Sequence, residues 1–278
     1  MNQAKDQDSQ RLQLANHLKL TEDLWQKLYY VKWNPKSFAM LARLAQEISH
    51  ARQANPNLQL VLGHGSGSFG HVVAAKYGTR RGVAGSAAWR GFAEVSASAM
   101  RLNALVKEAL LAAGVPAMTL SPSASVGCEN GRIVHITAAP IAAALAAGLV
   151  PIVHGDVAFD SQIGGTIVST EEVMMALAPT LRPAWLLLAG ETAGVYDQQG
   201  ATIPLITPHN LADIEAALGG SRGTDVTGGM ASKVRGMLAL AAQQPQMAIR
   251  IFSGLEAGVL EQVLAEPETA VGTLLRHR

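Results

Sequence analysis

The sequence predicts an α/β protein, a three-layer αβα sandwich around a central, mainly parallel sheet. From residue 40 onward, apolar runs of strand length alternate with segments of helical periodicity, and this alternation is typical of a parallel sheet with helices on both faces. Glycine-rich stretches follow several of the strand-like runs, which is where ligands bind in open α/β sheets. The 278 residues contain no internal repeat or linker, so we expect a single domain.

Each predicted strand is a short apolar run, and each predicted helix has apolar residues at helical spacing. Ser169 and Glu172 have the spacing of a capping box, which predicts a helix start. Gly114 follows a long helical segment and is a common type of helix terminator. The predicted helices are 40–53, a short one within 72–78, 89–113, 139–147, 169–181, 209–220 and 230–244. The predicted strands are 58–63, 115–121, 149–159, 184–190 and 247–252, and the continuous apolar run of 184–190 is typical of a strand buried on both faces.

Composition indicates a cytoplasmic globular protein. Hydrophobic residues make up 49% of the chain, charged residues 15%, and the formal net charge is +1, so a broad nucleic-acid footprint is disfavoured. The one cysteine, Cys128, cannot form an intrachain disulfide and fits a reducing compartment. No run of about 20 apolar residues is present to span a membrane, and the polar start MNQAKDQDSQ does not resemble a signal peptide. We expect neither nucleic acid nor a membrane as a partner.

Residues 1–39 do not follow the alternation of strands and helices. The stretch RLQLANHLKL, residues 11–20, is compatible with a strand or a helix, and residues 21–38 have no clear period. We treat 1–39 as an anomalous N-terminal segment.

Three glycine-containing loops follow predicted strands: GHGSGSFGH at 63–71, HGDVAFDSQIGGT at 154–166 and TDVTGGMASK at 224–233. Glycine lets the backbone approach a phosphate, and free N–H groups at helix starts favour anionic oxygens. Three such loops suggest a site that handles more than one phosphoryl group. The first loop also matches G-x-G-x-x-G, but no acidic residue follows at the end of a second strand, and no Gly-Lys-Ser/Thr makes it a P-loop.

Lys233 is the candidate cation for these phosphates. It lies four residues past Gly229, one helical turn, so its amine can return toward the loop; the alternative is an exposed helix lysine. His71 ends the first glycine loop, where a donor or cationic imidazole would hold a substrate phosphate; the alternative is a surface histidine.

Acidic side chains follow apolar strands at Asp156, Asp160 and Glu191. Carboxylates there suit magnesium, a sugar hydroxyl or electrostatic alignment, and equally the capping of loops. The run 89–106 holds small and apolar side chains that suit either the core or an apolar ligand. Histidine and cysteine are common metal ligands, but four of those in this chain do not have the spacing of a known metal site. We interpret them as structural: His64, His135, His154 and Cys128.

Four stretches, in this order along the chain, carry a resemblance to a known family. They are HGSGSFGH at 64–71, HGDVAFD with GGTIVSTEE at 154–172, ETAGVYD at 191–197 and DVTGGMASKV at 225–234. Through them the sequence from residue 40 to the C-terminus resembles the amino acid kinase superfamily and, within it, the isopentenyl phosphate kinases. The resemblance implies an amino acid kinase domain over 40–278 and a homodimer. It also implies transfer of the ATP γ-phosphate, with Mg²⁺, onto isopentenyl phosphate to give isopentenyl diphosphate.

The resemblance also implies roles for matching residues. It implies three catalytic residues: His71, Lys233 and Lys19. It implies that the acceptor is bound by Ser66, His71, Gly155 and Asp156, and ATP by Gly67, Glu191, Gly194, Tyr196, Gly229 and Lys233. No residue of this chain is implied as a metal ligand. Relatives that act on carboxylates or carbamate lack a histidine matching His71, so this residue points to a phosphorylated acceptor.

The sequence departs from the family pattern in three places. Ser66 replaces a glycine, and ETAGVYD stands where Thr-Asp-Val-Asp-Gly-Val-Tyr is usual. The larger departure is at the start, where the family has a strand ending in Lys-Leu-Gly-Gly-Ser whose lysine and glycine amides bind the transferring phosphate. Here Lys19-Leu20 is followed by Thr-Glu-Asp, and carboxylates at that place would repel phosphates.

We hypothesise a local frame error from about Thr21 to about Phe38. Codons for Thr21 to Trp25, read two bases later, can spell Gly-Gly-Ser and then Leu, Val or Met, so Lys19-Leu20 would run into the expected motif. Resequencing the DNA decides this, because codons that cannot read Gly-Gly-Ser end the hypothesis. If the sequence is literal, the rival is a phosphate- or nucleotide-binding homologue without turnover. A further alternative is a kinase for another small phosphate or a phosphonate such as fosfomycin.

Overall fold

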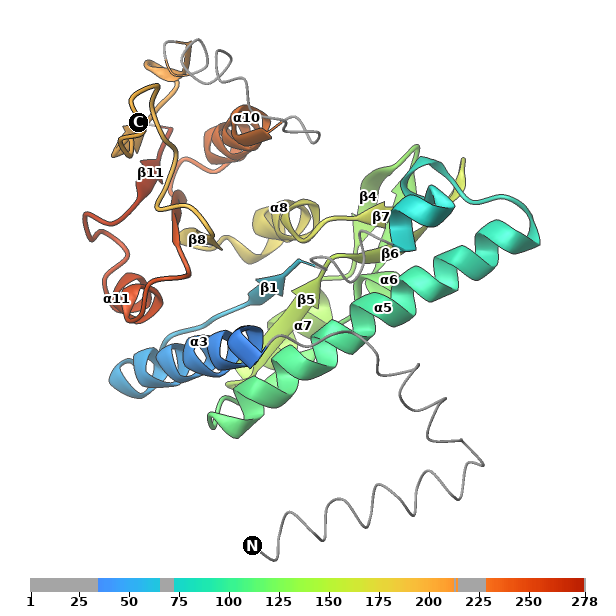
Figure 1. Cartoon of the computed structure of the whole chain (residues 1–278), viewed down its shortest axis with the longest axis horizontal. Coiled ribbons are helices and arrows are strands. Elements are labelled where there is room, and N and C mark those ends of the chain that lie inside the picture. The colour runs from blue at the N-terminus through green and yellow to red at the C-terminus, as the bar shows by residue number, and fades with distance from the viewer. Residues whose placement is uncertain (1–34, 66–72, 213, 215–228, 278) are drawn as a thin grey trace, which may run out of the picture. The chain divides into compact units, whose positions relative to one another are not determined.

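The computed structural model describes residues 35–65, 73–212, 214 and 229–277, and the chain separates into two compact units, 1–39 and 40–278. Helices and strands alternate through the second unit (Figure 1). The structure confirms the α/β class, and its described strands form three hydrogen-bonded sheets.

The first sheet is parallel and has the strand order β1–β5–β2, with β1 at Leu62–His64, β5 at Val150–His154 and β2 at Ala117–Thr119. In the register of this sheet the last residue of β1, His64, lies opposite the last residue of β5, His154. Every residue of β5 is buried, as expected for the central strand of a parallel sheet.

The second sheet has the order β8–β10–β11–β9: β8 at Trp185–Gly190, β10 at Ala248–Ser253, β11 at Thr273–Leu275 and β9 at Leu205–Ile206. Strands β8 and β10 are parallel, and β11 is antiparallel to β10. The expectation that 184–190 is buried on both faces is wrong, because the residues of β8 are half-buried or exposed. Within the described chain only β10 pairs with β8, and the partly buried Leu186 and Leu188 pack against one hydrophobic cluster while Leu187 packs against another.

The third sheet has the order β4–β3–β6–β7: β4 at Arg132–Ile136, β3 at Val126–Glu129, β6 at Asp156–Asp160 and β7 at Gly164–Val168. The single strand expected over 149–159 is therefore wrong. Strand β5 ends before Gly155, whose N–H donates to the carbonyl oxygen of His64 (3.2 Å). The chain then continues as β6, which belongs to a different sheet. An apolar run does not reveal such a change of sheet, because both strands are apolar.

The helices agree with the predicted periodicity. The expected helices 40–53, 89–113, 139–147, 169–181 and 230–244 correspond, in order, to α3 (Pro35–Ala54), α5 (Gly85–Ala112), α7 (Ala139–Ala146), α8 (Thr170–Leu181) and α10 (Gly229–Gln243). Most of the helix expected at 209–220 lies outside the described residues. Three shorter helices were not expected: η1 (Thr79–Arg81), α6 (Pro122–Ser125) and α11 (Val259–Ala265).

The start of α8 confirms the predicted capping box. The Ser169 hydroxyl accepts from the Glu172 backbone N–H (3.1 Å), and the Glu172 carboxylate accepts from the Ser169 N–H (2.6 Å). Gly114 ends α5 with φ of 79°, a conformation that glycine adopts without strain.

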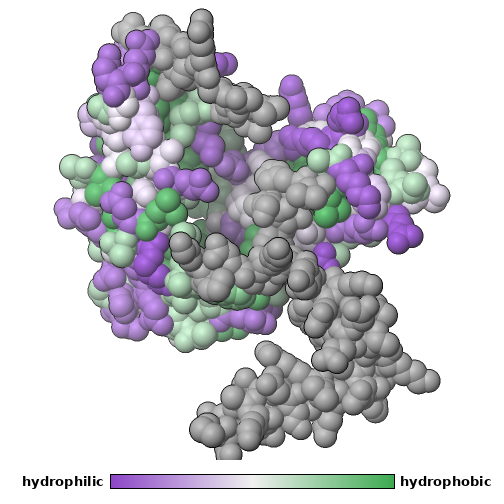
Figure 2. Space-filling model, in the orientation of Figure 1, coloured by the Kyte–Doolittle hydropathy of each residue, from purple (hydrophilic) through white to green (hydrophobic). Residues whose placement is uncertain are grey.

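Separate hydrophobic clusters hold the sheets and helices together. One joins α3, α5 and β5 through Ile48, Leu110 and Ile152, and another joins α10 to β10 through Val234 and Ile249. On the face seen in Figure 2, hydrophobic residues lie in patches among hydrophilic ones. No helix among the described residues is both long and apolar enough to cross a bilayer.

Replacing Ser169 with alanine should destabilise the protein by about 0.5–2 kcal/mol, because the first turn of α8 loses the hydroxyl that accepts from Glu172. Urea unfolding of wild type and Ser169→Ala measures the difference. Ser121→Ala is the control, since Ser121 is the N-cap residue of α6 and its side chain makes no capping hydrogen bond. Equal unfolding midpoints for wild type and Ser169→Ala would contradict the assignment.

Candidate functional site

The carbonyl oxygen of His64 joins three elements at the carboxyl end of β1. It accepts hydrogen bonds from the Gly155 N–H, just past β5, and from the Thr170 hydroxyl at the start of α8 (2.6 Å). Helix α8 also packs closely on β1, since a Cβ at Gly63 would lie 2.6 Å from the Thr170 methyl group and 2.7 Å from Met174. Residues that the sequence predicts to bind the acceptor, Gly155 and Asp156, therefore lie beside the end of β1.

Two histidine rings lie under this junction. His64 and His154 stack with their centroids 5.4 Å apart, and His154 is fully buried. Burial lowers the pKa of His64, and the neighbouring His154 lowers it further. Hydrogen bonds with Gly65 and Asn103 raise it, but the net effect is a lowered pKa. The His64 ring is therefore neutral near pH 7, and it contributes packing and hydrogen bonds rather than charge.

Lys233, on α10, is held at the start of α8. Its Nζ lies 3.0 Å from a carboxylate oxygen of Glu171, and both side chains are about 40% exposed. The sequence left two interpretations of Lys233 open, and this half-exposed ion pair is compatible with both of them. The sequence analysis missed Glu171, although an acidic residue in the first turn of a capped helix was a usable signal.

Asp156 and Asp160 have backbone partners. The carboxylate of Asp156, which is buried, accepts from the N–H groups of Val157 (2.8 Å) and Ser123 (3.3 Å). The carboxylate of Asp160 accepts from four N–H groups, those of Asn130, Gly131, Gln162 and Ile163. Of the roles left open for these carboxylates, capping of loops is the one that the contacts show.

The predicted nucleotide-binding residues Glu191, Gly194 and Tyr196 follow β8. A Cβ at Gly194 would lie 2.6 Å from the Thr273 hydroxyl oxygen, so this loop packs against β11 only because the residue is glycine. The Tyr196 hydroxyl oxygen accepts from the Ala193 N–H (3.1 Å) and closes the loop. The loop is thus built on the second sheet, at the carboxyl end of β8.

Several predicted site residues lie outside the described residues: Lys19, Ser66, Gly67 and His71. Gly229 is the first residue of α10, one turn before Lys233. In the run 89–106, Phe92, Val95 and Ala99 are buried, so this face of α5 belongs to the core. Among the residues that the structure describes, no group of three or more His, Cys, Asp or Glu side chains is arranged to hold a metal ion.

Comparison with known proteins identifies the class. The profile of the amino acid kinase family matches residues 30–253, and the chain belongs to this family. It is 33% identical over 238 residues to the isopentenyl phosphate kinase of Methanothermobacter thermautotrophicus, covering 82% of this chain and 87% of that protein. It is 40% identical over 173 residues to the isopentenyl phosphate kinase of Haloferax volcanii, covering 62% of this chain and 68% of that protein.

Solved structures agree with this assignment. A crystal structure of isopentenyl phosphate kinase superimposes with a TM-score of 0.70 at 28% identity, covering 85% of this chain and 90% of the other. The carbamate kinase of Giardia lamblia shares the fold, with a TM-score of 0.60 at 14% identity.

Asp160 should make the stability depend on pH. Burial alone would raise its pKa, but the hydrogen bonds from Gly131, Ile163, Gln162 and Asn130 lower it overall. Its contribution is therefore complete above the ordinary aspartate pKa of about 4 and is lost as pH falls through the lower value in the folded protein. Asp160→Asn should be less stable than wild type by about 1–3 kcal/mol near pH 7.

The measurement is urea unfolding of both proteins at about pH 7 and about pH 3, where the difference in stability should shrink. Asp197→Asn, in an exposed turn, is the control. A difference that stays constant over this range would show that the Asp160 charge does not stabilise the loop.

Proposed function

We propose that the protein phosphorylates isopentenyl phosphate with ATP and releases isopentenyl diphosphate and ADP. The observation that carries this proposal is the junction at His64, where the acceptor loops of β1 and β5 meet the helix that holds Lys233 through Glu171. Family membership and the identity to isopentenyl phosphate kinases support the choice of reaction.

The chemistry is an in-line phosphoryl transfer. An oxygen of the acceptor phosphate forms a bond to the γ-phosphorus, the bond from that phosphorus to the β,γ-bridging oxygen breaks, and ADP leaves. Such a reaction needs positioning and charge neutralisation more than a covalent nucleophile. We assign Lys233 to the ATP phosphates, with Gly67, Glu191, Gly194, Tyr196 and Gly229 around the nucleotide. We assign His71, with Ser66, Gly155 and Asp156, to the acceptor, and Lys19 to the transferring phosphate.

The carboxylates near the junction are compatible with a magnesium ion that binds together with the nucleotide and has few protein ligands. The carboxylates near the junction are engaged, Asp156 by backbone amides and Glu171 by Lys233, so the described residues do not offer it a protein cage. Mg²⁺ usually keeps several waters and binds substrate phosphates. When bound, it would neutralise charge on the ATP phosphates.

Whether a protein with this sequence is catalytically active depends on its N-terminal segment. The absence of Gly-Gly-Ser after Lys19-Leu20 favours, as a second candidate, a homologue that binds phosphate or nucleotide without transfer. The hypothesised frame error over residues 21–38 would remove that objection. We further propose a homodimer in the cytoplasm, as the resemblance and the composition suggest.

The test is an assay of purified full-length protein, from a gene whose DNA has been checked, with ATP, Mg²⁺ and isopentenyl phosphate. The proposal predicts isopentenyl diphosphate and equimolar ADP, and no product with fosfomycin. Binding of both ligands without product would support the second candidate. Turnover of fosfomycin but not of isopentenyl phosphate would contradict the proposed acceptor and support a phosphonate kinase.

Replacing His71 with alanine should raise the KM for isopentenyl phosphate at least about tenfold, or abolish activity, because a charge-assisted hydrogen bond to the acceptor phosphate is lost. The KM for ATP should change much less. His135→Ala, on β4 and exposed, is the matched control. Steady-state kinetics with each substrate varied check this, and normal acceptor kinetics in His71→Ala would remove the residue from the site.

A further inference from the structure

The two halves of the proposed site stand on two different sheets. The acceptor loops follow β1 and β5 of the first sheet, which we call the acceptor sheet, and the nucleotide loop follows β8 of the second sheet, the nucleotide sheet. Within the described residues β1 pairs with β5 and β8 pairs with β10, and no hydrogen-bonded ladder joins the two sheets. Among the described residues, the two sheets are therefore joined by side-chain packing and by contacts through other elements.

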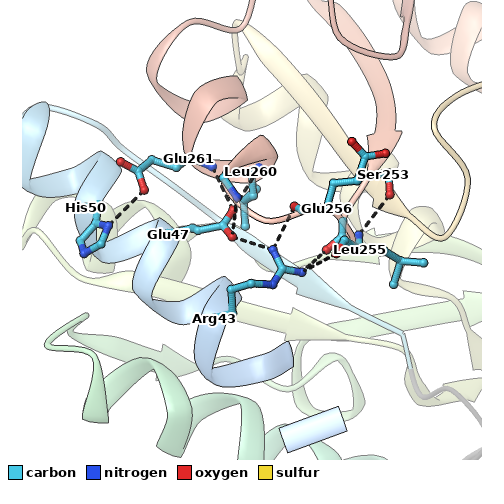
Figure 3. A network of polar contacts seen from close by, with 10 residues as sticks. Arg43, Glu47, His50, Ser253, Leu255, Glu256, Leu260 and Glu261 are labelled. Atoms are coloured by element: carbon cyan, nitrogen blue, oxygen red, sulfur yellow. Dashed lines mark hydrogen bonds and ion pairs between the residues drawn. The ribbon is translucent and has the colours of Figure 1, made fainter. Parts of the chain in front are cut away.

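Helix α3 packs in a hydrophobic cluster that reaches both sheets, because Leu187 of β8 packs against it. Its apolar residues Ala45, Ile48 and Ala51 are buried in the cluster that contains Ile152 of β5 in the acceptor sheet. The same cluster contains Leu264 of α11, the helix that follows β10. The polar contacts of α3 reach the same region, as Figure 3 shows.

Arg43 binds the backbone of the segment that follows β10. Its guanidinium donates to the carbonyl oxygens of Gly254 (2.5 Å), Glu256 (3.0 Å) and Leu255 (3.3 Å) (Figure 3). One planar group with several donors satisfies three carbonyls at once, which a lysine ammonium on a flexible stem does not reproduce.

Glu47, one turn further along α3, holds the start of α11. Its carboxylate accepts from the N–H groups of Gly258 (3.0 Å), Leu260 (3.1 Å) and Glu261 (3.3 Å), and it pairs with Arg43 at 2.6 Å. Burial alone would raise the pKa of Glu47, but the bonds from Gly258 and Arg43 lower it overall. Glu47 is therefore ionised near pH 7, and loss of Arg43 would leave this buried charge with its backbone N–H partners alone.

Residues 254–256, whose carbonyl groups accept hydrogen bonds from Arg43, are also hydrogen-bonded to the end of β8. The Gly254 N–H donates to the carbonyl oxygen of Gly190 (2.8 Å), and Gly190 directly precedes Glu191 of the nucleotide loop. A continuous series of contacts thus runs from β5 through α3 and Arg43 to the nucleotide loop.

We propose that Arg43 and Glu47 are positioning residues that fix the separation of the acceptor sheet from the nucleotide sheet. This inference rests on the proposed function for the identity of the two ligands. Each ligand contacts its own sheet, whereas transfer requires both reacting groups to be aligned. Loosening the link should therefore lower kcat far more than it weakens the binding of either ligand, since small misplacements cost about 100-fold in rate.

The first experiment compares Arg43→Lys, Glu47→Gln and Glu47→Ala with wild type. We expect kcat to fall about 10–100-fold, while calorimetric Kd values for isopentenyl phosphate and a non-hydrolysable ATP analogue stay within about threefold. The matched control is His50→Ala, which removes an exposed ion pair between the same two helices, His50 with Glu261 (3.0 Å). Unchanged kcat in the Arg43 and Glu47 variants, or an equal fall in His50→Ala, would overturn the proposal.

The second experiment does not depend on activity. Spin labels on Met118→Cys in β2 and Leu205→Cys in β9, both exposed positions, report the distance between the sheets, and Cys128 is buried. Pulsed electron resonance should show a narrow distribution in the labelled parent and with His50→Ala, and a broader or shifted one with Glu47→Gln. Identical distributions would contradict the proposal. If wild type shows no turnover, the proposed function fails, and the distances still decide the role of Arg43 and Glu47.

Discussion

The hydrogen bonds to the carbonyl oxygen of His64 are the constraint on which the rest of the site depends. They bring the Gly155 N–H and the Thr170 hydroxyl to one point at the end of β1. Through Gly155 this point fixes the turn between β5 and β6, and through Thr170 it fixes the first turn of α8, whose Glu171 pairs with Lys233. The proposed phosphoryl transfer needs such positioning, together with neutralisation of the phosphate charges.

A second constraint lies between the sheets. In the proposed site the two ligands bind to different sheets, so transfer between them would require the sheets to keep a constant separation. We propose that Arg43 and Glu47 do this with charge-assisted hydrogen bonds to backbone groups, of which those to Glu47 are part-buried. Helix α3 follows the N-terminal segment in which the sequence departs from its family.

Local signals in the sequence predicted much of the fold. The capping box at Ser169 and the helical periodicity were read correctly because they depend on neighbouring residues. The break at Gly155 and the half-exposed β8 were missed, because burial and sheet membership depend on strands distant in sequence. The pairing of Glu171 with Lys233 was missed for the same reason. The glycine loops suggested phosphate binding from residue type alone. The hydrogen bonds from backbone N–H groups to Asp156 and Asp160 could be found only in the structure.

A crystal structure with a non-hydrolysable ATP analogue and isopentenyl phosphate tests the central claim most directly. The account predicts the acceptor phosphate between the loop after β1 and Gly155, with the Lys233 amine turned from Glu171 to the nucleotide phosphates. An acceptor phosphate bound away from the ends of β1 and β5, or a nucleotide that does not contact the loop after β8, would contradict it.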